Sequence, residues 1–161
     1  MENANRARNH KSQKCIKHFV NNNFIKIPVH AGIFYLKKNK KMISQKNLSI
    51  AHKWFEAFNN HNIDQLLSLY DDEAEHFSPK LKIKKPETNG LVKGKIALHN
   101  WWQDAFEQLP TLNYKVTSLT ANDDRVFMEY IRTVNNENDM LIAEVLDIKE
   151  GKIVFSRVYH G

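Results

Sequence analysis

The clearest pattern along the chain is a hydrophobic stripe at helical spacing near residue 50. Ala51, Trp54, Phe55 and Phe58 stand at positions i, i+3, i+4 and i+7, which places them on one face of an α-helix. The positions between them are mostly polar. The pattern therefore predicts an amphipathic helix over residues 48–60.

Two more helices are predicted downstream of this stripe. Asn62 is followed three residues later by Gln65, which is the spacing of a capping box at a helix N-terminus. The buried side of this short second helix consists of Ile63, Leu66, Leu67 and Tyr70. A third helix is predicted over residues 95–108, because Pro110 follows a run of apolar residues at helical spacing. Those residues are Leu98, Trp101, Trp102, Ala105 and Leu109.

The remaining pattern is that of β-strands. Residues 75–78 are predicted to form a first strand, and the segment 79–93, which begins PKLKIKKPETNG, to form a loop. After Pro110 come four β-branched or aromatic runs of strand length, at 114–120, 126–134, 140–149 and 153–160. Short turns between them predict antiparallel pairing. Helices followed by strands indicate an α+β fold, with helices covering one face of a curved sheet.

This order of elements resembles the SnoaL-like branch of the nuclear transport factor 2 superfamily. The resemblance covers residues 48–161 and rests on the segments AFNNHNIDQL, DDEAEHFSP, GLVKGKIALHNWWQDAFEQLP, DDRVFMEY and EGKI. It implies a cone-shaped α+β fold in which three N-terminal helices pack on a curved antiparallel sheet around a cavity. The superfamily includes ketosteroid isomerases and polyketide cyclases as well as binding and docking domains. Function must therefore be argued from the site.

Comparison with ketosteroid isomerases argues against that activity. Ser78 stands where the resemblance implies the general-base aspartate, immediately before Pro79. Trp54 stands where those enzymes carry their oxyanion-donating tyrosine. Both changes remove groups that isomerisation requires. Only the position of their second carboxylic acid, matched by Glu144, keeps an acid.

The candidate catalytic residues are His76, Glu144 and His160. A histidine titrates near neutral pH, and a buried carboxylate could orient its ring or raise its pKa. A His76–Glu144 pair with His160 at the mouth would suit an aldol-type cyclisation or a dehydration. The alternative is structural: the histidines could be wall residues, and Glu144 could form an ion pair with Arg132 or Arg157.

The candidate ligand-binding residues are mostly aromatic side chains expected around the cavity. They are Trp54, Phe58, Tyr70, Ser78, Trp101, Trp102, Tyr130 and Arg132. Aromatic residues at helical spacing are also typical of an ordinary core. The lysines of residues 80–85 form either a solvated loop or an attractive rim for an anionic ligand. No histidine spacing predicts a metal site and no glycine-rich phosphate loop is present, so we expect neither a metal nor another cofactor.

Charge divides the chain at Met42. Residues 1–41 contain ten Lys or Arg and one acid, a net charge of +9, which leaves 14 basic and 17 acidic residues, a net −3, in residues 42–161. The basic leader is either a solvated tail, a targeting peptide or an upstream extension of a chain that starts at Met42. The basic pI is thus no evidence that the domain binds nucleic acid.

Cysteine content and hydropathy bear on the cellular location of the protein. Cys15 is the only cysteine and precedes the domain, so disulfide frameworks are excluded from the domain. This favours an intracellular location, which we expect to be the cytoplasm. After residue 41 nothing approaches the ~20 consecutive apolar residues of a membrane span. We expect no membrane partner.

Two functions from different classes fit this sequence. The first is a cofactor-independent enzyme that performs acid/base chemistry on a hydrophobic carbonyl compound. The second is a non-catalytic domain that binds a small hydrophobic molecule or serves for dimerisation. A homodimer through the outer face of the sheet is predicted, because both faces of the run 126–131 are apolar. A sheet buried on one side only would alternate more cleanly.

Overall fold

The computed structural model describes residues 16–20, 23–27 and 29–160. The chain consists of two compact units, Met1–Asn39 and Lys40–Gly161. In the first unit, strands β1 (Ile16–Val20) and β2 (Asn23–Ile27) pair in antiparallel fashion. The prediction that residues 1–41 form a leader outside the domain stays a prediction.

Helix α1 spans Val29–Asn59 and so begins well before the predicted start at residue 48. No proline interrupts residues 29–59, and lysines with other good helix formers are frequent in residues 36–47. Such residues extend a helix without a hydrophobic stripe. The predicted stripe is confirmed as its buried face, since Ala51, Trp54, Phe55 and Phe58 are all buried.

The second and third predicted helices are confirmed, except that Tyr70, expected on the buried side of the second helix, is the first residue of β3. Helix α2 spans Ile63–Ser68, and the Asn62 side chain accepts a hydrogen bond from the Gln65 backbone N–H. Helix α4 spans Lys95–Gln108 and buries Leu98, Trp102 and Phe106. These residues join the α1 stripe in one hydrophobic core.

The sheet of the second unit has six strands in the order β4-β3-β8-β7-β6-β5. They are β3 (Tyr70–Phe77), β4 (Leu91–Lys93), β5 (Asn113–Ala121), β6 (Arg125–Thr133), β7 (Met140–Lys149) and β8 (Lys152–His160). The α+β prediction is confirmed, with two corrections. The first strand begins at Tyr70 rather than residue 75, and it pairs with β8 in parallel while the other pairs are antiparallel.

The segment 79–93 is more ordered than the loop that its composition predicts. It contains helix α3 (Pro79–Lys84), a 3₁₀ turn η1 (Pro86–Thr88) and strand β4. Pro79 at the start of α3 suits a first helical turn, and Leu81 is fully buried. The buried Leu81 and the pairing of β4 with β3 both hold this segment against the domain.

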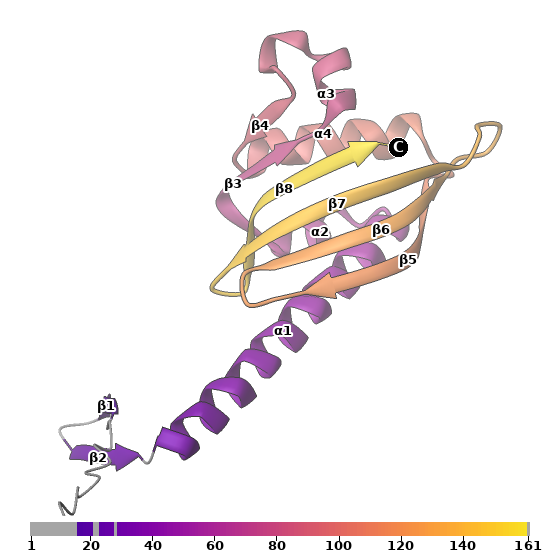
Figure 1. Ribbon diagram of the computed structural model, residues 1–161. Helices are drawn as coiled ribbons and strands as arrows, with labels where there is room; N and C mark the ends of the chain where they lie inside the picture. The colour runs from indigo at the N-terminus through magenta and orange to yellow at the C-terminus, as the bar shows by residue number, and fades with distance from the viewer. Residues whose placement is uncertain (1–15, 21–22, 28, 161) are drawn as a thin grey trace, which may run out of the picture. The chain divides into compact units, whose positions relative to one another are not determined.

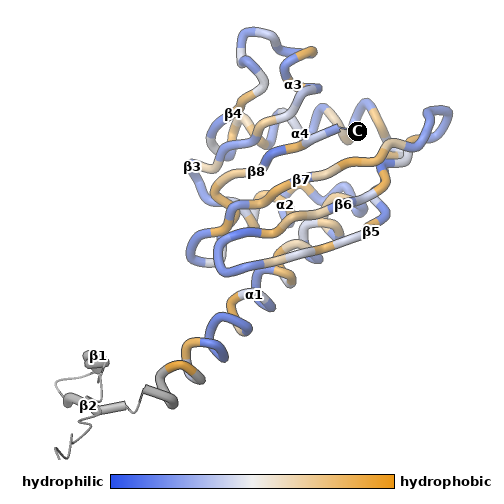
Figure 2. The backbone as a smooth tube through the Cα atoms, viewed as in Figure 1, coloured by the Kyte–Doolittle hydropathy of each residue, from blue (hydrophilic) through white to orange (hydrophobic). Residues whose placement is uncertain are grey.

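The helices α2 and α4 and the C-terminal part of α1 cover one face of the curved sheet (Figure 1). Along β6 and β7, alternate residues face this layer and are buried, for example Val126, Met128 and Tyr130. Hydrophobic residues concentrate along β7, whereas the turns that join β5 to β6 and β6 to β7 are hydrophilic (Figure 2). Within the described residues, no helix is both long and apolar enough to cross a membrane.

Candidate functional site

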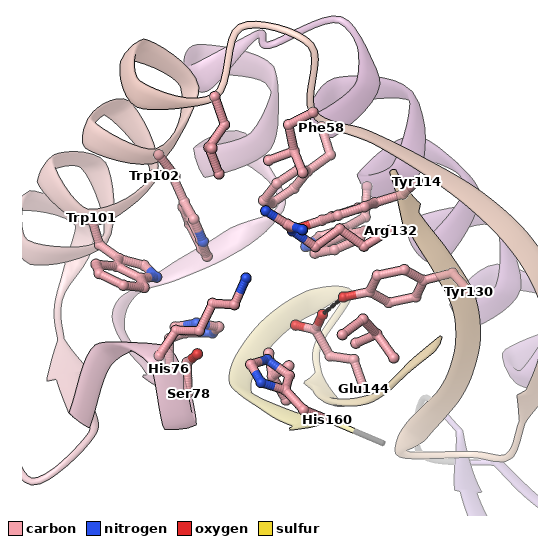
Figure 3. A pocket seen from close by; sticks show the side chains of 17 residues that line it. Phe58, His76, Ser78, Trp101, Trp102, Tyr114, Tyr130, Arg132, Glu144 and His160 are labelled. Carbon is pink, nitrogen blue, oxygen red and sulfur yellow. Dashed lines mark hydrogen bonds between the residues drawn. The ribbon is translucent and has the colours of Figure 1, made fainter. Parts of the chain in front are cut away.

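A cavity of about 90 Å³ lies between the helices and the sheet (Figure 3). Its walls are mostly aromatic and aliphatic, with a few buried polar groups. The lining residues are Trp54, Phe58, His76, Ser78, Lys80, Trp101, Trp102, Ala105, Leu109, Leu112, Tyr114, Tyr130, Arg132, Ile142, Glu144, Val158 and His160. An apolar pocket with few polar groups is the usual form of a small-molecule site.

Ten of the eleven residues singled out in the sequence line this cavity, and Tyr70 is the exception. Tyr70 is fully buried behind the wall, where its ring packs 4.8 Å from that of Trp102. His76 near the end of β3 and Ser78, in extended conformation just after it, are both buried, as the predicted alternation requires. The sequence therefore identified the cavity wall, while the role of each residue in it is a separate question.

Glu144 is the most unusual group in the cavity. It comes from the centre of β7, and its side chain is buried among apolar neighbours on the inner face of the sheet. Tyr130 Oη donates a 2.8 Å hydrogen bond to Glu144 Oε2 (Figure 3). The other oxygen, Oε1, is buried and has no hydrogen-bond partner among the described residues.

Burial decides the protonation of this carboxyl. Removal from water raises the pKa of Glu144 to about 7, and the hydrogen bond from Tyr130 opposes this only in part. The alternative of an ion pair with Arg132 or Arg157 is not what forms, since Arg132 binds Glu137 and Arg157 binds Asp147. The neutral phenol of Tyr130 partners the carboxyl instead. It supplies a hydrogen bond without the positive charge that would hold the pKa down.

His76 is held by a chain of buried hydrogen bonds rather than by Glu144. Trp54 Nε1 donates to Tyr70 Oη over 2.9 Å, and Tyr70 Oη donates to Ser156 Oγ over 3.4 Å. Ser156 Oγ lies 2.7 Å from His76 Nδ1. No hydrogen bond joins His76 to Glu144 in the described part of the chain, so the direct pair expected from the sequence is wrong.

The direction of this chain fixes the form of His76. An indole N–H can only donate, so Tyr70 accepts from Trp54 and turns its own proton toward Ser156. Ser156 is fully buried, and Nδ1 of His76 is then the acceptor left for its hydroxyl proton. This direction favours a neutral His76 with its proton on Nε2. Burial agrees with this form, because it lowers the pKa of His76 to about 3.

The mouth of the cavity carries basic groups. Lys80 from α3 and His160 from β8 are half-buried there, and Arg132 from β6 is buried beside them. His160 has a lowered pKa, caused first by burial and then by the positive charges of Lys80 and Arg132. The three side chains therefore share one electrostatic environment.

Comparison with known sequences gives the family. The profile of the SnoaL-like domain matches residues 51–156, which is most of the second unit. The chain belongs to the SnoaL-like domain family. A search of curated proteins found no match.

Solved structures similar to this SnoaL-like domain share its fold. A SnoaL-like protein of unknown function from Burkholderia thailandensis is 24% identical, with a TM-score of 0.66 over 73% of this chain and 95% of that one. An NTF2-like protein from Anabaena variabilis is 19% identical, with a TM-score of 0.62 over 73% and 91%. A protein from Sinorhizobium meliloti with a provisional polyketide cyclase assignment is 15% identical, with a TM-score of 0.59 over 69% and 94%. At these identities the similarity establishes the fold alone.

Sequence reasoning missed one important member of this SnoaL-like site. Ser156 lies beside His76 because β3 and β8 pair in parallel, with His76 opposite Ser156 in the register. The two residues are 80 positions apart, and a lone serine in a strand carries no signal of its own. Knowledge of the β3–β8 pairing would have been needed to find it.

Proposed function

We propose that the cavity of this SnoaL-like domain binds a small carbonyl compound and that Glu144 exchanges a proton with it, without a cofactor. The observation that carries this proposal is the buried, unpartnered Oε1 of Glu144, which belongs to a carboxyl that lines a cavity. A buried polar atom without a partner costs free energy. A ligand or a transferred proton at Oε1 would remove that cost.

The pKa of Glu144 suits proton transfer at neutral pH. General acids and bases work best when their pKa lies near the working pH, and burial brings that of Glu144 to about 7. In its ionised form, Oε1 would take a proton from the carbon next to the carbonyl. The electron pair of that C–H bond would move toward the carbonyl oxygen and leave an enolate. The protonated Glu144 would then return the proton.

His76 would act as a hydrogen-bond donor rather than as a base. Its Nδ1 lies 2.7 Å from Ser156 Oγ, and with the Ser156 hydroxyl as the donor the ring proton is on Nε2. A fixed N–H beside the carbonyl oxygen would stabilise the negative charge that develops on the enolate. This assignment differs from the acid/base role that the sequence suggested, because a group with a pKa near 3 cannot collect protons at pH 7.

The fate of the enolate separates the possible reactions. Return of the proton to a different carbon would be an isomerisation. Loss of a hydroxide that Glu144 protonates would be a dehydration, and attack of the enolate carbon on a second carbonyl would be a cyclisation. All three begin with the same proton abstraction by Glu144. That step is therefore the one to test first.

A non-catalytic binding role is the second candidate. It is favoured by Ser78, which stands on the cavity wall where ketosteroid isomerases carry a general base. Ligand binding alone needs only the apolar wall and the polar anchors of Tyr130 and Arg132. In that case Glu144 would accept a hydrogen bond from the ligand and transfer nothing.

Hydrogen–deuterium exchange into a small ketone tests the proposal. The protein is incubated with 2-pentanone in D₂O at neutral pH, and NMR follows the loss of the proton signals next to the carbonyl. We expect the wild type to accelerate exchange and E144Q to lose about 100-fold or more of the acceleration. The matched control is E129Q, because Glu129 faces the opposite side of the sheet. Equal exchange by wild type and E144Q would contradict the proposal.

A further inference from the structure

Arg132 offers more hydrogen-bond donors than the protein uses. Its side chain is 6% exposed, and its Nη1 donates to Glu137 Oε2 over 2.7 Å. A guanidinium carries five N–H donors, and this is its one side-chain hydrogen bond within residues 29–160. Buried arginines normally have most of their donors paired. Arg132 is one of the residues that line the cavity.

Lys80 adds a second cation at the same place. It lines the cavity from the first turn of α3, half-buried. Its pKa is lowered by burial and then by the positive charge of Arg132; Glu137 opposes this, and Lys84 lowers the pKa slightly further. The single negative charge of Glu137 compensates only one of the two positive charges of Arg132 and Lys80. The mouth of the cavity keeps an uncompensated positive charge, with the neutral ring of His160 beside it.

The other lysines of the same segment do not share this position. Lys84 Nζ donates to Gln108 Oε1 over 2.6 Å, and Lys85 Nζ lies 3.9 Å from a carboxylate oxygen of Asp104. Lys82 is exposed, and it does not line the cavity. The placement of Lys80 is therefore specific and does not follow from the basic composition of the loop alone.

We propose that the mouth is a carboxylate subsite and that the substrate is a short carbonyl compound carrying a carboxylate group. Arg132 and Lys80 would hold the carboxylate, and the carbonyl end would extend inward toward Glu144 and His76. The placement of the carbonyl near Glu144 and His76 rests on the proposed function. The placement of the carboxylate rests on the positions of Arg132 and Lys80.

The size of the cavity limits the inner part of the ligand. A cavity of ~150 Å³ accepts a benzene molecule, and this one measures about 90 Å³. A chain of a few carbon atoms fits that volume, while a fused ring system does not. The substrate class is therefore a short-chain oxo acid, with its charged end at the mouth.

The test compares 4-oxopentanoate with 2-pentanone, in which a methyl group replaces the carboxylate. Binding of each is measured by NMR titration of the wild-type protein at pH 7 in low salt. We expect 4-oxopentanoate to bind about tenfold tighter or more, the effect of a charge-assisted hydrogen-bonded contact, and to weaken as salt is added. Equal affinity for the two compounds, or failure of 4-oxopentanoate to bind, would overturn the proposal.

Variants test whether Lys80 and Arg132 cause the preference for 4-oxopentanoate. K80Q and R132Q should each reduce the preference for 4-oxopentanoate by about fivefold or more, while K82Q on the same helix should leave it unchanged. Because R132Q also removes the partner of Glu137, K80Q provides the test that does not depend on a buried residue. An unchanged preference in K80Q and R132Q would overturn the assignment.

The experiments distinguish failure of the carboxylate-subsite proposal from failure of the proposed function. Preferential binding of 4-oxopentanoate without exchange of its protons in D₂O would support the subsite and contradict proton transfer by Glu144. Glu144-dependent exchange with equal affinity for both compounds would support proton transfer and overturn the subsite.

Discussion

Tyr130 donates a hydrogen bond to one oxygen of Glu144, and the other oxygen of the same buried carboxyl has no partner among the described residues. A carboxylate that served only for stability would be expected to have both oxygens satisfied. A half-satisfied carboxyl on a cavity wall is instead ready to accept a donor from a ligand. This relationship distinguishes Glu144 from the paired acids Glu137 and Asp147.

The stability of the domain should depend on pH through Glu144. Its pKa rises from 4.5 to about 7 on folding, so the folded state binds this proton more tightly than the unfolded chain. The carboxyl therefore stabilises the fold fully below about pH 4.5, and this contribution is lost as the pH rises through 7. E144Q should gain stability relative to the wild type between pH 5 and pH 8, by up to about 3 kcal/mol.

Urea unfolding at the two pH values measures this change, with E129Q on the opposite face of the sheet as the control. A difference between E144Q and wild type that stays constant from pH 5 to pH 8 would show that the carboxyl is already ionised at pH 5.

The tautomer of His76 is a second prediction. The hydrogen-bond chain from Trp54 requires a neutral ring with its proton on Nε2, and burial keeps it neutral to about pH 3. Nitrogen-15 NMR of labelled histidine should show an unprotonated Nδ1 and a protonated Nε2 from pH 5 to pH 8. S156A removes the donor to Nδ1 and should produce a mixture of tautomers. A wild-type ring with its proton on Nδ1 would mean that His76 donates to Ser156, and it would contradict this assignment.

Gly90 should be essential for the backbone conformation between η1 and β4. Its φ is +87°, and a Cβ there would lie 2.9 Å from a ring atom of Phe77 and 3.2 Å from the Ser78 carbonyl oxygen. G90A should lower the free energy of unfolding by about 1–3 kcal/mol. G151A is the matched control, because its φ is similar and a Cβ would contact nothing within 4 Å. Equal losses in the two variants would show that the close contact costs nothing.

The outer face of the sheet is predicted to form a homodimer. It exposes large apolar side chains on neighbouring strands, with Leu141 58%, Tyr159 50% and Phe127 38% exposed. Light scattering at micromolar concentration should give about twice the chain mass of 18.9 kDa, and L141K should shift the mass toward the monomer. A wild-type mass of one chain would refute the dimer.

The features predicted correctly from sequence depend on local spacing. The α1 stripe and the inward position of Glu144 follow from periods of 3.6 and 2 residues. The partner of Glu144 was missed because it depends on register. Met128 faces Glu144 across β6 and β7, and Tyr130 faces Ile142, so Tyr130 is the diagonal neighbour of Glu144 on the same face. The sequence pattern within either strand does not predict this register.

Two further errors, in the β3–β8 pairing and in residues 79–93, also arise from contacts beyond the local sequence. The parallel pairing of β3 with β8 joins strands far apart in sequence, so turn length gives no information about it. The order in residues 79–93 comes with the pairing of β4 with β3 and the burial of Leu81, and the lysine-rich composition indicates neither. Local sequence therefore predicts the elements and their inner faces, whereas the contacts that set the chemistry of His76 and Glu144 come from long-range pairing.

The central claim, that Glu144 can exchange a proton at neutral pH, is tested most directly by titrating that carboxyl. Carbon-13 NMR of protein labelled at glutamate Cδ, with E144Q to assign the signal, gives its pKa in the folded state. We predict a midpoint near 7, caused by burial. A midpoint near the ordinary glutamate value of about 4.3 would contradict this account, because the carboxyl would then be ionised and solvated like any surface acid.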